Sequence, residues 1–378
     1  MSDRRRSLPA RLAVAVLRRV PQRQREQVLR RVASITPVAT RVLGAEDTLA
    51  RLSQVDDESL DRMVARFVND PPDQAAVGRL LRALGDGIPF QMWERHGWHL
   101  TANHFYSPIP DTLSLPDSIW KEPSELPGID MREQAQVELL EQAGERWAEE
   151  FNALPRTSVE PGHYFVDNGA FESVDAEMYW SLIRTNRPKL ILEIGAGWST
   201  LLADRAMAAN EADGHPGRIL SIEPYPYEFV RDAAERSSRI DLQVAPLQSF
   251  SLDTFARLQA GDILFIDSSH VCKVGSDVHY EILELLPRVN PGVLVHVHDI
   301  FLPEDYPRDW VLGPEHRFWN EQYVLQAFLA FNRDFEVVWG SSFMHNRHPE
   351  LLERTIASYE PTSRHPGSIW LRRAQGTR

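Results

Sequence analysis

The sequence predicts an α/β protein in which a helical N-terminal domain precedes a doubly wound, mostly parallel sheet. Three observations predict this class. Apolar residues recur at three- and four-residue steps between residues 8 and 100, which indicates helices. Residues 101–130 hold five prolines and little periodicity. Beyond residue 186, short apolar runs alternate with helical patterns, which is typical of βαβ units. We therefore divide the chain into a helical domain with a basic arm (1–100), a proline-rich connector or lid (101–130) and a sheet domain (131–375).

The elements of the sheet domain follow in chain order. Helical patterns cover 131–152 and 174–186, and further helices are expected from Ser199 onward, across 229–236 and around 276–286. Seven apolar runs predict seven strands: KLILEIG, RILSIEP, DLQVAP, DILFID, GVLVHVHD, FEVVWG and SIWLRR. Prolines break the segment before the last run, so an antiparallel edge strand is expected there.

Composition excludes several classes of protein. The 378 residues are 43% apolar and 25% charged, as in ordinary globular proteins. A single cysteine excludes a disulfide framework and a thiolate metal cluster within the chain. The net charge of −13 argues against a nucleic-acid partner, which would require a basic surface. The expected partner is a small molecule.

The N-terminal arm is the basic exception, because residues 1–34 carry ten arginines and a net charge of +8. They resemble an amphipathic helix pair broken at Pro21, which either docks on an anionic membrane or partner or packs on its own domain. Arg11, Arg18 and Arg19 interrupt the apolar run that a secretory signal would need. No apolar stretch is long enough to span a membrane. We expect a cytoplasmic protein, and the sequence leaves a homo-oligomer open.

Ligand-binding residues are expected where strands end, because sites on such sheets lie at the carboxyl ends of the strands. The first strand ends in Glu193, Gly195, Gly197 and Ser199. The two glycines allow a tight turn and a close approach to a ligand. A dinucleotide fingerprint would have a third glycine at Thr200, and an acid before the turn would repel phosphate. The loop therefore favours a zwitterionic or cationic ligand over a pyrophosphate.

The second and third strands offer further contacts. Glu223 ends the second strand, where a carboxylate can bind both hydroxyls of a ribose. Gln248 follows the third strand and could meet an adenine edge.

The fourth and fifth strands end in acids and histidines. Asp267 and His270 follow the fourth strand, and His296, His298 and Asp299 end the fifth. Carboxylates suit Mg²⁺, and a nearby histidine can act as a general base at neutral pH. Alternation along the strand puts His296 on the same face as His298, and for His296 simple packing is the preferred interpretation.

Taken together, LEIGAGWST, SIEPYP, DILFIDSSH and VHVHDIF resemble the class I S-adenosylmethionine-dependent methyltransferases, over about residues 165–375. The resemblance implies a Rossmann-like, seven-stranded sheet whose last strand is antiparallel. It also implies that Glu193, Gly195 and Gly197 line the methionine end of S-adenosylmethionine and that Glu223 holds its ribose. The motifs are most similar to bacterial enzymes that act on secondary metabolites and their sugars.

The acids after strands four and five are also similar to the metal-dependent O-methyltransferases. That resemblance implies that Asp267 and Asp299 bind Mg²⁺ and that His270 is the base. The sequence departs from the pattern after Asp299, where those enzymes have a further oxygen ligand and this chain has Ile300. His298 precedes the acid instead and is the additional candidate ligand. Metal dependence stays open at this point.

Candidate contacts for the acceptor lie outside the strand ends, and each could equally pack the two domains together. They are His104 and Tyr106 in the connector, Asn168 and Phe171 in the loop before residue 174, and Trp319 after strand five.

Three other functions stay open. The chain could bind the cofactor as a scaffold without catalysis, or it could transfer the aminobutyryl group of the same cofactor. A nicotinamide oxidoreductase is disfavoured by the missing third glycine and by the acid before the turn.

Overall fold

The computed structural model describes residues 90–95, 97, 99, 101–363 and 365–375. The chain divides into two compact units, Met1–Asp111 and Thr112–Arg378. The predicted helical domain and its basic arm fall almost entirely outside the described residues, and α7 (Phe90–Glu94) is the helix described within the first unit. Among the described residues, no helix is both long and apolar enough to cross a membrane.

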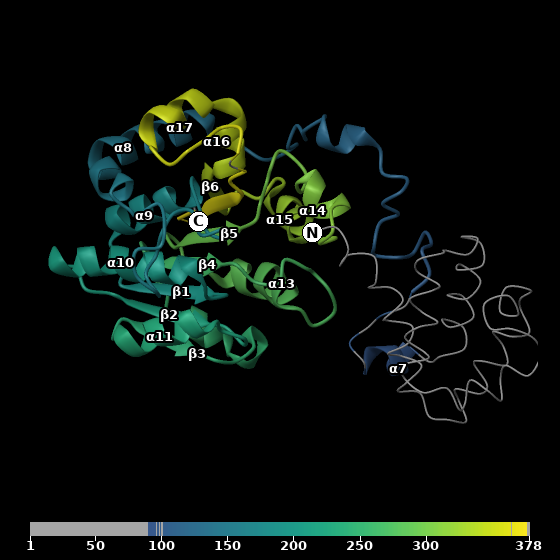
Figure 1. The fold of residues 1–378 in the computed structure, drawn as a ribbon, viewed down its shortest axis with the longest axis horizontal. Helices are drawn as coiled ribbons and strands as arrows, with labels where there is room; N and C mark the ends of the chain where they lie inside the picture. Colours follow the sequence, from purple (N-terminus) through teal and green to yellow (C-terminus); the bar gives the residue numbers. More distant parts are fainter. Residues whose placement is uncertain (1–89, 96, 98, 100, 364, 376–378) are drawn as a thin grey trace, which may run out of the picture. The chain divides into compact units, whose positions relative to one another are not determined.

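The second unit is built on a seven-stranded sheet with helices on either side of it (Figure 1). The order across the sheet is β3-β2-β1-β4-β5-β7-β6, and β7 runs antiparallel to both β5 and β6. All seven predicted strands are present, and the last strand is antiparallel as predicted. It is not an edge strand, however, because β7 pairs with β5 on one side and β6 on the other, which leaves β6 at the edge. In chain order they are β1 (Leu190–Ile194), β2 (Arg218–Ile222), β3 (Ile240–Gln243), β4 (Ile263–Ile266), β5 (Leu294–His298), β6 (Phe335–Gly340) and β7 (Ser368–Arg373).

Most helices also lie where the sequence predicts them. The helices expected at 131–152, 174–186 and 229–236 are present as α8, α9 and α11, and the helix after the first strand is α10. The longer helices are α8 (Glu133–Asn152), α9 (Asp175–Asn186), α10 (Trp198–Ala212), α11 (Glu228–Arg236) and α15 (Glu321–Leu329). The shorter ones are α12 (Leu252–Phe255), α14 (Arg308–Leu312), α16 (Ser341–Arg347), α17 (Pro349–Thr355), η1 (Asp117–Trp120) and η2 (Leu247–Ser249).

The helix expected around 276–286 is not one regular helix. It is divided into α13 (Asp277–Tyr280), a π-helical turn η3 (Glu281–Leu285) and a 3₁₀ turn η4 (Leu286–Arg288). Pro287 lies within the last turn, and a proline cannot continue α-helical hydrogen bonding. Such π turns occur frequently at functional sites.

The later part of the proline-rich connector belongs to the second unit and packs on the segment after β5. The indole of Trp120 donates to the carbonyl of Tyr306 at 3.0 Å, and the amide of Ser124 donates to the carbonyl of Pro303 at 2.9 Å. These bonds tie the connector to the chain that follows the fifth strand.

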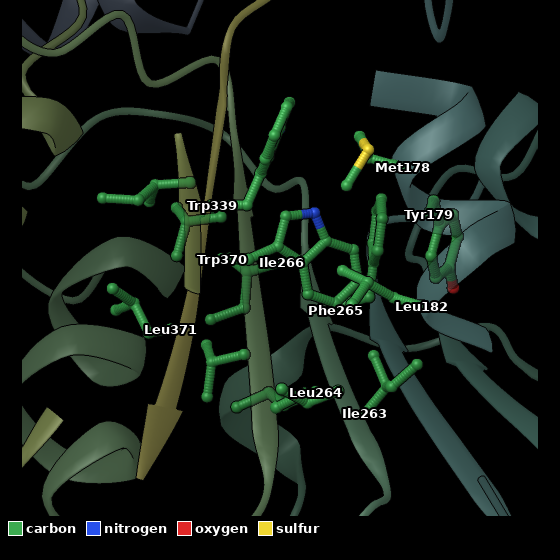
Figure 2. Packing of buried hydrophobic residues seen from close by; sticks show 14 of the residues in the cluster. Met178, Tyr179, Leu182, Ile263, Leu264, Phe265, Ile266, Trp339, Trp370 and Leu371 are labelled. Carbon is green, nitrogen blue, oxygen red and sulfur yellow. The ribbon is translucent and has the colours of Figure 1, made fainter. Parts of the chain in front are cut away.

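One row of side chains crosses a face of the sheet and joins the core to the site. Strand register aligns Ser221, Glu193, Phe265, His296 and Trp370 on neighbouring strands. The ring of His296 stacks on that of Phe265 with their centroids 4.1 Å apart, and its centroid lies 4.7 Å from that of Trp370. Figure 2 shows Phe265 and Trp370 within this buried cluster. His296 is wholly buried, and neither ring nitrogen has a hydrogen-bond partner within the described part of the chain, in agreement with a packing role.

Candidate functional site

The loop after β1 packs against the end of β4. Gly195 has a φ of +85°, a left-handed conformation that glycine adopts without strain. A Cβ atom on Gly195 would lie 1.8 Å from the carbonyl oxygen of Asp267, so a larger residue does not fit. A Cβ atom on Gly197 would meet no atom within 4 Å. Gly195 therefore permits close packing of two strand ends, whereas Gly197 presents its backbone to open space.

Glu193 lies beneath this loop, not on its surface. The side chain is wholly buried, and it accepts hydrogen bonds from the hydroxyls of Ser199 at 2.8 Å, Thr200 at 2.7 Å and Ser221 at 2.5 Å. The Thr200 hydroxyl in turn accepts from the amide of Gly197 at 3.1 Å. Both side chains are thus used to hold the loop, and a direct contact of Glu193 or Ser199 with the cofactor stays a prediction.

The same burial changes the acidity of Glu193. Removal from water raises the pKa of this carboxyl to about 7, although hydrogen bonds from Ser221, Thr200 and Ser199 favour the ionised form. Thr200 occupies the place of the third glycine in a dinucleotide fingerprint. Its hydroxyl explains the departure, since it links the loop backbone to Glu193.

Glu223 lies at the end of β2 beside the same loop, where the sequence places it. One oxygen accepts from the amide of Ala196 at 3.3 Å and the other from the amide of Tyr225 at 2.7 Å. The carboxylate is half-buried and joins the first two strand ends. Gln248 is exposed, and its amide donates to the carbonyl of Gly275 at 3.0 Å. The ribose and adenine contacts predicted for these two residues stay predictions.

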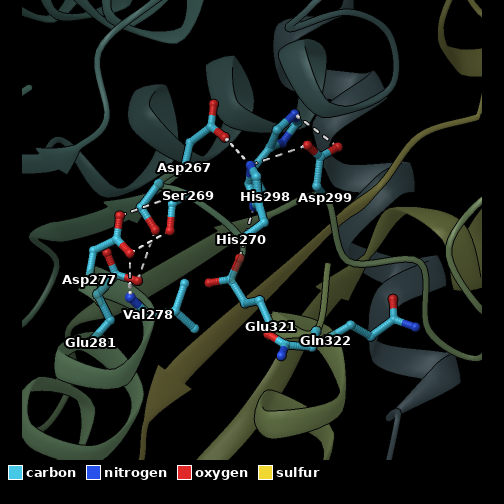
Figure 3. Close-up of polar contacts among 12 residues, drawn as sticks. Asp267, Ser269, His270, Asp277, Val278, Glu281, His298, Asp299, Glu321 and Gln322 are labelled. Carbon is cyan, nitrogen blue, oxygen red and sulfur yellow. Dashed lines mark hydrogen bonds and ion pairs between the residues drawn. The ribbon is translucent and has the colours of Figure 1, made fainter. Parts of the chain in front are cut away.

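Asp267, His270 and Asp299 come together at the ends of β4 and β5 (Figure 3). The Nε2 atom of His270 lies 3.3 Å from Oδ1 of Asp267 and 3.4 Å from Oδ2 of Asp299. Its Nδ1 atom lies 2.9 Å from an oxygen of Glu321. His270 and Asp299 have φ values of +58° and +54°, which residues with a Cβ rarely adopt. Such strained backbone is typical of functional sites.

Opposite charges dominate this cluster. Burial alone would lower the pKa of His270, but hydrogen bonds to Asp267 and Glu321 outweigh it and hold this pKa well above its usual range. Burial would raise the pKa of Asp267, yet His298 and His270 lower it to about 2. The ring of His270 therefore keeps its proton at neutral pH, although burial raises the pKa of Asp299 and of Glu321 above the usual value of a carboxyl.

The donor atoms fit a divalent cation. One oxygen of each aspartate and one nitrogen of His270 lie within 4.8 Å of one another. The separations of 3.3 and 3.4 Å between the ring nitrogen and the two oxygens match atoms that share an ion about 2.1 Å from each. Carboxylates suit Mg²⁺ or Mn²⁺, whereas an imidazole nitrogen favours a transition metal.

His298 lies beside this group but is not part of it, and its role as a ligand stays a prediction. Its Nε2 atom lies 3.9 Å from Asp299, and its buried Nδ1 atom has no hydrogen-bond partner among the described residues. The ring of His298 packs against that of Phe171, with the two centroids 5.1 Å apart. The nitrogen donor of the set is His270, which the resemblance assigned as the base.

Two buried acids at the site were given no individual role from the sequence: Glu321 was expected only as part of a helix start near the acceptor, and Glu281 was not considered. Glu321 is the first residue of α15 and is 1% exposed. Glu281 begins the π-helical turn η3, is wholly buried and accepts from the hydroxyl of Ser268 at 3.1 Å. An acid in the first turn of a helix is common on protein surfaces. The only sequence signal for Glu321 was therefore that it follows strand five.

The residues predicted to contact the acceptor separate into two groups. Trp319 lies at the site, with its ring centroid 4.3 Å from that of His270. Asn168 is used within its own loop, where its amide donates to the carbonyl of Phe171 at 2.9 Å. Phe171 is 2% exposed and packs against Phe265. Asn168 and Phe171 thus contribute to the loop and the core, and a contact of either with an acceptor stays a prediction.

His104 and Tyr106 lie in the first unit. The amide of Tyr106 donates to Nδ1 of His104 at 3.0 Å, and the Tyr106 ring is 87% exposed. A contact of these residues with an acceptor stays a prediction.

Comparison with known proteins agrees with this architecture. Residues 192–300 match the family model of a methyltransferase domain, and this range runs from β1 through the strand ends that carry the cluster. The chain belongs to the class I S-adenosylmethionine-dependent methyltransferases. This methyltransferase is 33% identical over 167 residues to an uncharacterised protein of Archaeoglobus fulgidus, covering 41% of the chain and 72% of the relative.

Among solved structures, this methyltransferase is similar to the S-adenosylhomocysteine-bound methyltransferase PaMTH1 of Podospora anserina. The two are 16% identical, and the match covers 73% of this chain and 99% of the other with a TM-score of 0.35. The family assignment does not depend on this weak likeness.

Proposed function

We propose that this methyltransferase transfers the methyl group of S-adenosylmethionine to a hydroxyl oxygen of a small molecule, such as a sugar or a secondary metabolite. The observation that carries the proposal is the position of the Asp267–His270–Asp299 cluster. It adjoins the cofactor loop directly, because Gly195 packs on the carbonyl of Asp267 with no room for a Cβ atom between them. Groups that can bind and deprotonate a hydroxyl therefore lie beside the expected position of the methyl donor.

The cofactor would be held by the ends of the first three strands. Gly195 and Gly197 would admit its methionine end, Glu223 would bind the ribose, and Gln248 would approach the adenine. Glu193 would fix the loop from beneath, because it accepts a hydrogen bond from the Thr200 hydroxyl, which itself accepts from the amide of Gly197. This division of roles is supported by the burial of Glu193 and by the open space at Gly197.

Methyl transfer requires a well-placed nucleophilic oxygen and little covalent help from the protein. Asp267 and Asp299 are partly exposed, with 32% and 16% of their side chains accessible, so they can meet the acceptor hydroxyl. His270 is the candidate base for the hydroxyl proton. The ring can accept a proton only after losing its own, and a positive charge bound at the two aspartates would favour that loss.

We further propose that a divalent cation such as Mg²⁺ supplies that charge. Asp267 and Asp299 would hold it through their carboxylate oxygens, which lie within 4.8 Å of each other, and Nε2 of His270 would stay free to act as the base. When bound, such an ion lowers the pKa of a coordinated hydroxyl and orients it.

The test is incubation with methyl-labelled S-adenosylmethionine and a panel of hydroxylated glycosides and catechols, with and without EDTA. We expect label on acceptor oxygen and S-adenosylhomocysteine as the by-product. EDTA should abolish transfer and added Mg²⁺ or Mn²⁺ should restore it. Transfer that is insensitive to EDTA would refute the metal, and methylthioadenosine as the by-product would refute methyl transfer.

A matched pair of variants separates the site from the fold. Asp267→Asn should abolish transfer while S-adenosylhomocysteine still binds. Asp241→Asn, which changes an exposed acid on β3, should leave both unchanged. Full activity in Asp267→Asn would contradict the assignment of the cluster.

A further inference from the structure

The first residue of α15, Glu321, contacts His270, although the two residues lie 51 positions apart in the chain. We propose that Glu321 is a positioning residue: it fixes the ring of His270 so that Nε2 faces Asp267 and Asp299. The inference rests on the proposed function, in which these three side chains meet the acceptor.

The backbone of His270 is hydrogen-bonded to the start of this helix. Its carbonyl accepts hydrogen bonds from the amides of Asn320 at 3.1 Å and Glu321 at 3.2 Å. The side chain of Asn320 accepts from the amide of Cys272 at 2.6 Å and donates to the carbonyl of Cys272 at 3.3 Å. The loop after β4 is thereby held at two residues. Such support is needed because His270 adopts the left-handed conformation.

The ring of His270 is fixed on two further sides. Glu321 lies 2.9 Å from Nδ1, and the ring of Trp319 lies over its face with the centroids 4.3 Å apart. Figure 3 shows Glu321 on one side of His270 and the two aspartates on the other. With Nδ1 and one face occupied, Nε2 is the atom left to face the reacting groups. Partners of this kind set the tautomer and orientation of histidines in metal and catalytic sites.

Stability alone does not explain a carboxylate at this position. Glu321 is 1% exposed, and its Oε1 atom has no hydrogen-bond partner among the described residues. A buried ion pair seldom stabilises a fold more than apolar side chains of similar volume, because both ions lose their hydration. A carboxylate is needed here to accept from the Nδ1 proton of His270, which a leucine could not do.

The test compares Glu321→Leu, which removes the acceptor, with Glu321→Gln, which keeps an acceptor oxygen but no charge. Glu177→Leu is the control, because Glu177 is likewise a buried acid in the first turn of a helix, α9, and does not contact His270. Three quantities are measured on the full chain: the ¹⁵N signals of the His270 ring in the metal-free protein, the kcat and KM for the acceptor, and the affinity for S-adenosylhomocysteine.

We expect Glu321→Leu to lower kcat by about 10- to 100-fold, with KM and cofactor affinity within about twofold of wild type. The His270 ring signals should shift in Glu321→Leu, Glu321→Gln should be intermediate, and Glu177→Leu should leave these signals unchanged. Unchanged ring signals in Glu321→Leu would overturn the inference, as would equal losses of kcat in Glu321→Leu and Glu177→Leu. If the wild-type protein transferred no methyl group, the proposed function would fail while the ring signals still decided the role of Glu321.

Discussion

Replacing Glu193 by glutamine removes an ionisable group from beneath the cofactor loop while nearly preserving its shape. In the folded protein, burial raises the pKa of Glu193 from 4.5 to about 7. The folded state therefore binds more protons than the unfolded state between these values, so stability falls as pH rises through this range. The stabilising contribution of Glu193 to the folded state is fully present below pH 4.5 and is lost above about pH 7. This is the reverse of a salt-bridged acid, whose stabilising effect is lost on acidification.

The magnitude follows from the same values. The difference between 4.5 and about 7, at about 1.4 kcal/mol for each pH unit, amounts to about 3 kcal/mol. The group is wholly buried, so solvent screening does not reduce this figure. Most of the change falls between pH 5 and pH 8, where the folded carboxyl loses its proton.

The assay is urea unfolding of the wild-type protein and Glu193→Gln at several values between pH 5 and pH 9. Glutamine does not titrate, and other groups contribute equally to both proteins. The wild-type free energy of unfolding relative to the variant should thus fall by about 2–3 kcal/mol over this range. Glu228→Gln, which changes an exposed acid of α11, should show no such trend. A difference for Glu193→Gln that is constant with pH, or that grows with pH, would refute the reasoning.

Four further outcomes can be measured directly. Gly195→Ala should destabilise the protein by several kcal/mol in urea unfolding, since its Cβ atom would lie 1.8 Å from the carbonyl oxygen of Asp267; a loss under about 1 kcal/mol would contradict this. Gly197→Ala should unfold like wild type but bind S-adenosylhomocysteine more weakly by calorimetry, and equal affinity would argue against a ligand at Gly197. His296→Phe should raise the free energy of unfolding by about 1 kcal/mol, because it removes two buried nitrogens without hydrogen-bond partners; a large loss would show a hidden polar contact. Asp299→Asn should weaken Mn²⁺ binding at least about tenfold in an electron paramagnetic resonance titration, and undiminished binding would exclude it as a ligand.

The parts of the fold that were predictable are those with a strong local signal. Seven short apolar runs became the seven strands, because a sheet covered on both faces needs nearly continuous apolar strands. Polar residues directly after such runs were then placed at one edge of the sheet by topology alone. Asp267, His270 and Asp299 were found in this way, although they lie up to 32 positions apart in the sequence.

Side-chain orientation was not predictable from the same signals. Glu193 was expected to line the methionine end of the cofactor, and its hydrogen bonds to Ser221 and Thr200 beneath the loop were not foreseen. Phe171 was expected to meet a ligand, but its ring fills the core. The partner of Glu321 could not be predicted, because its contact with His270 depends on how the chain returns after β5. Each of these outcomes depends on tertiary packing, which local patterns do not encode.

The loop after β1 and the acid–histidine cluster, which are the proposed donor and acceptor sites, are in direct contact. The contact between Gly195 and the carbonyl of Asp267 joins the loop that approaches the cofactor to the strand end that starts the acid–histidine cluster. The switch in strand order between β1 and β4 brings these two ends side by side. From the far side, the amides of Asn320 and Glu321 hold the carbonyl of His270. If the cluster is the acceptor site, as proposed, backbone contacts on both sides set the position of the reacting oxygen relative to the methyl donor, and flexible side chains need only complete it.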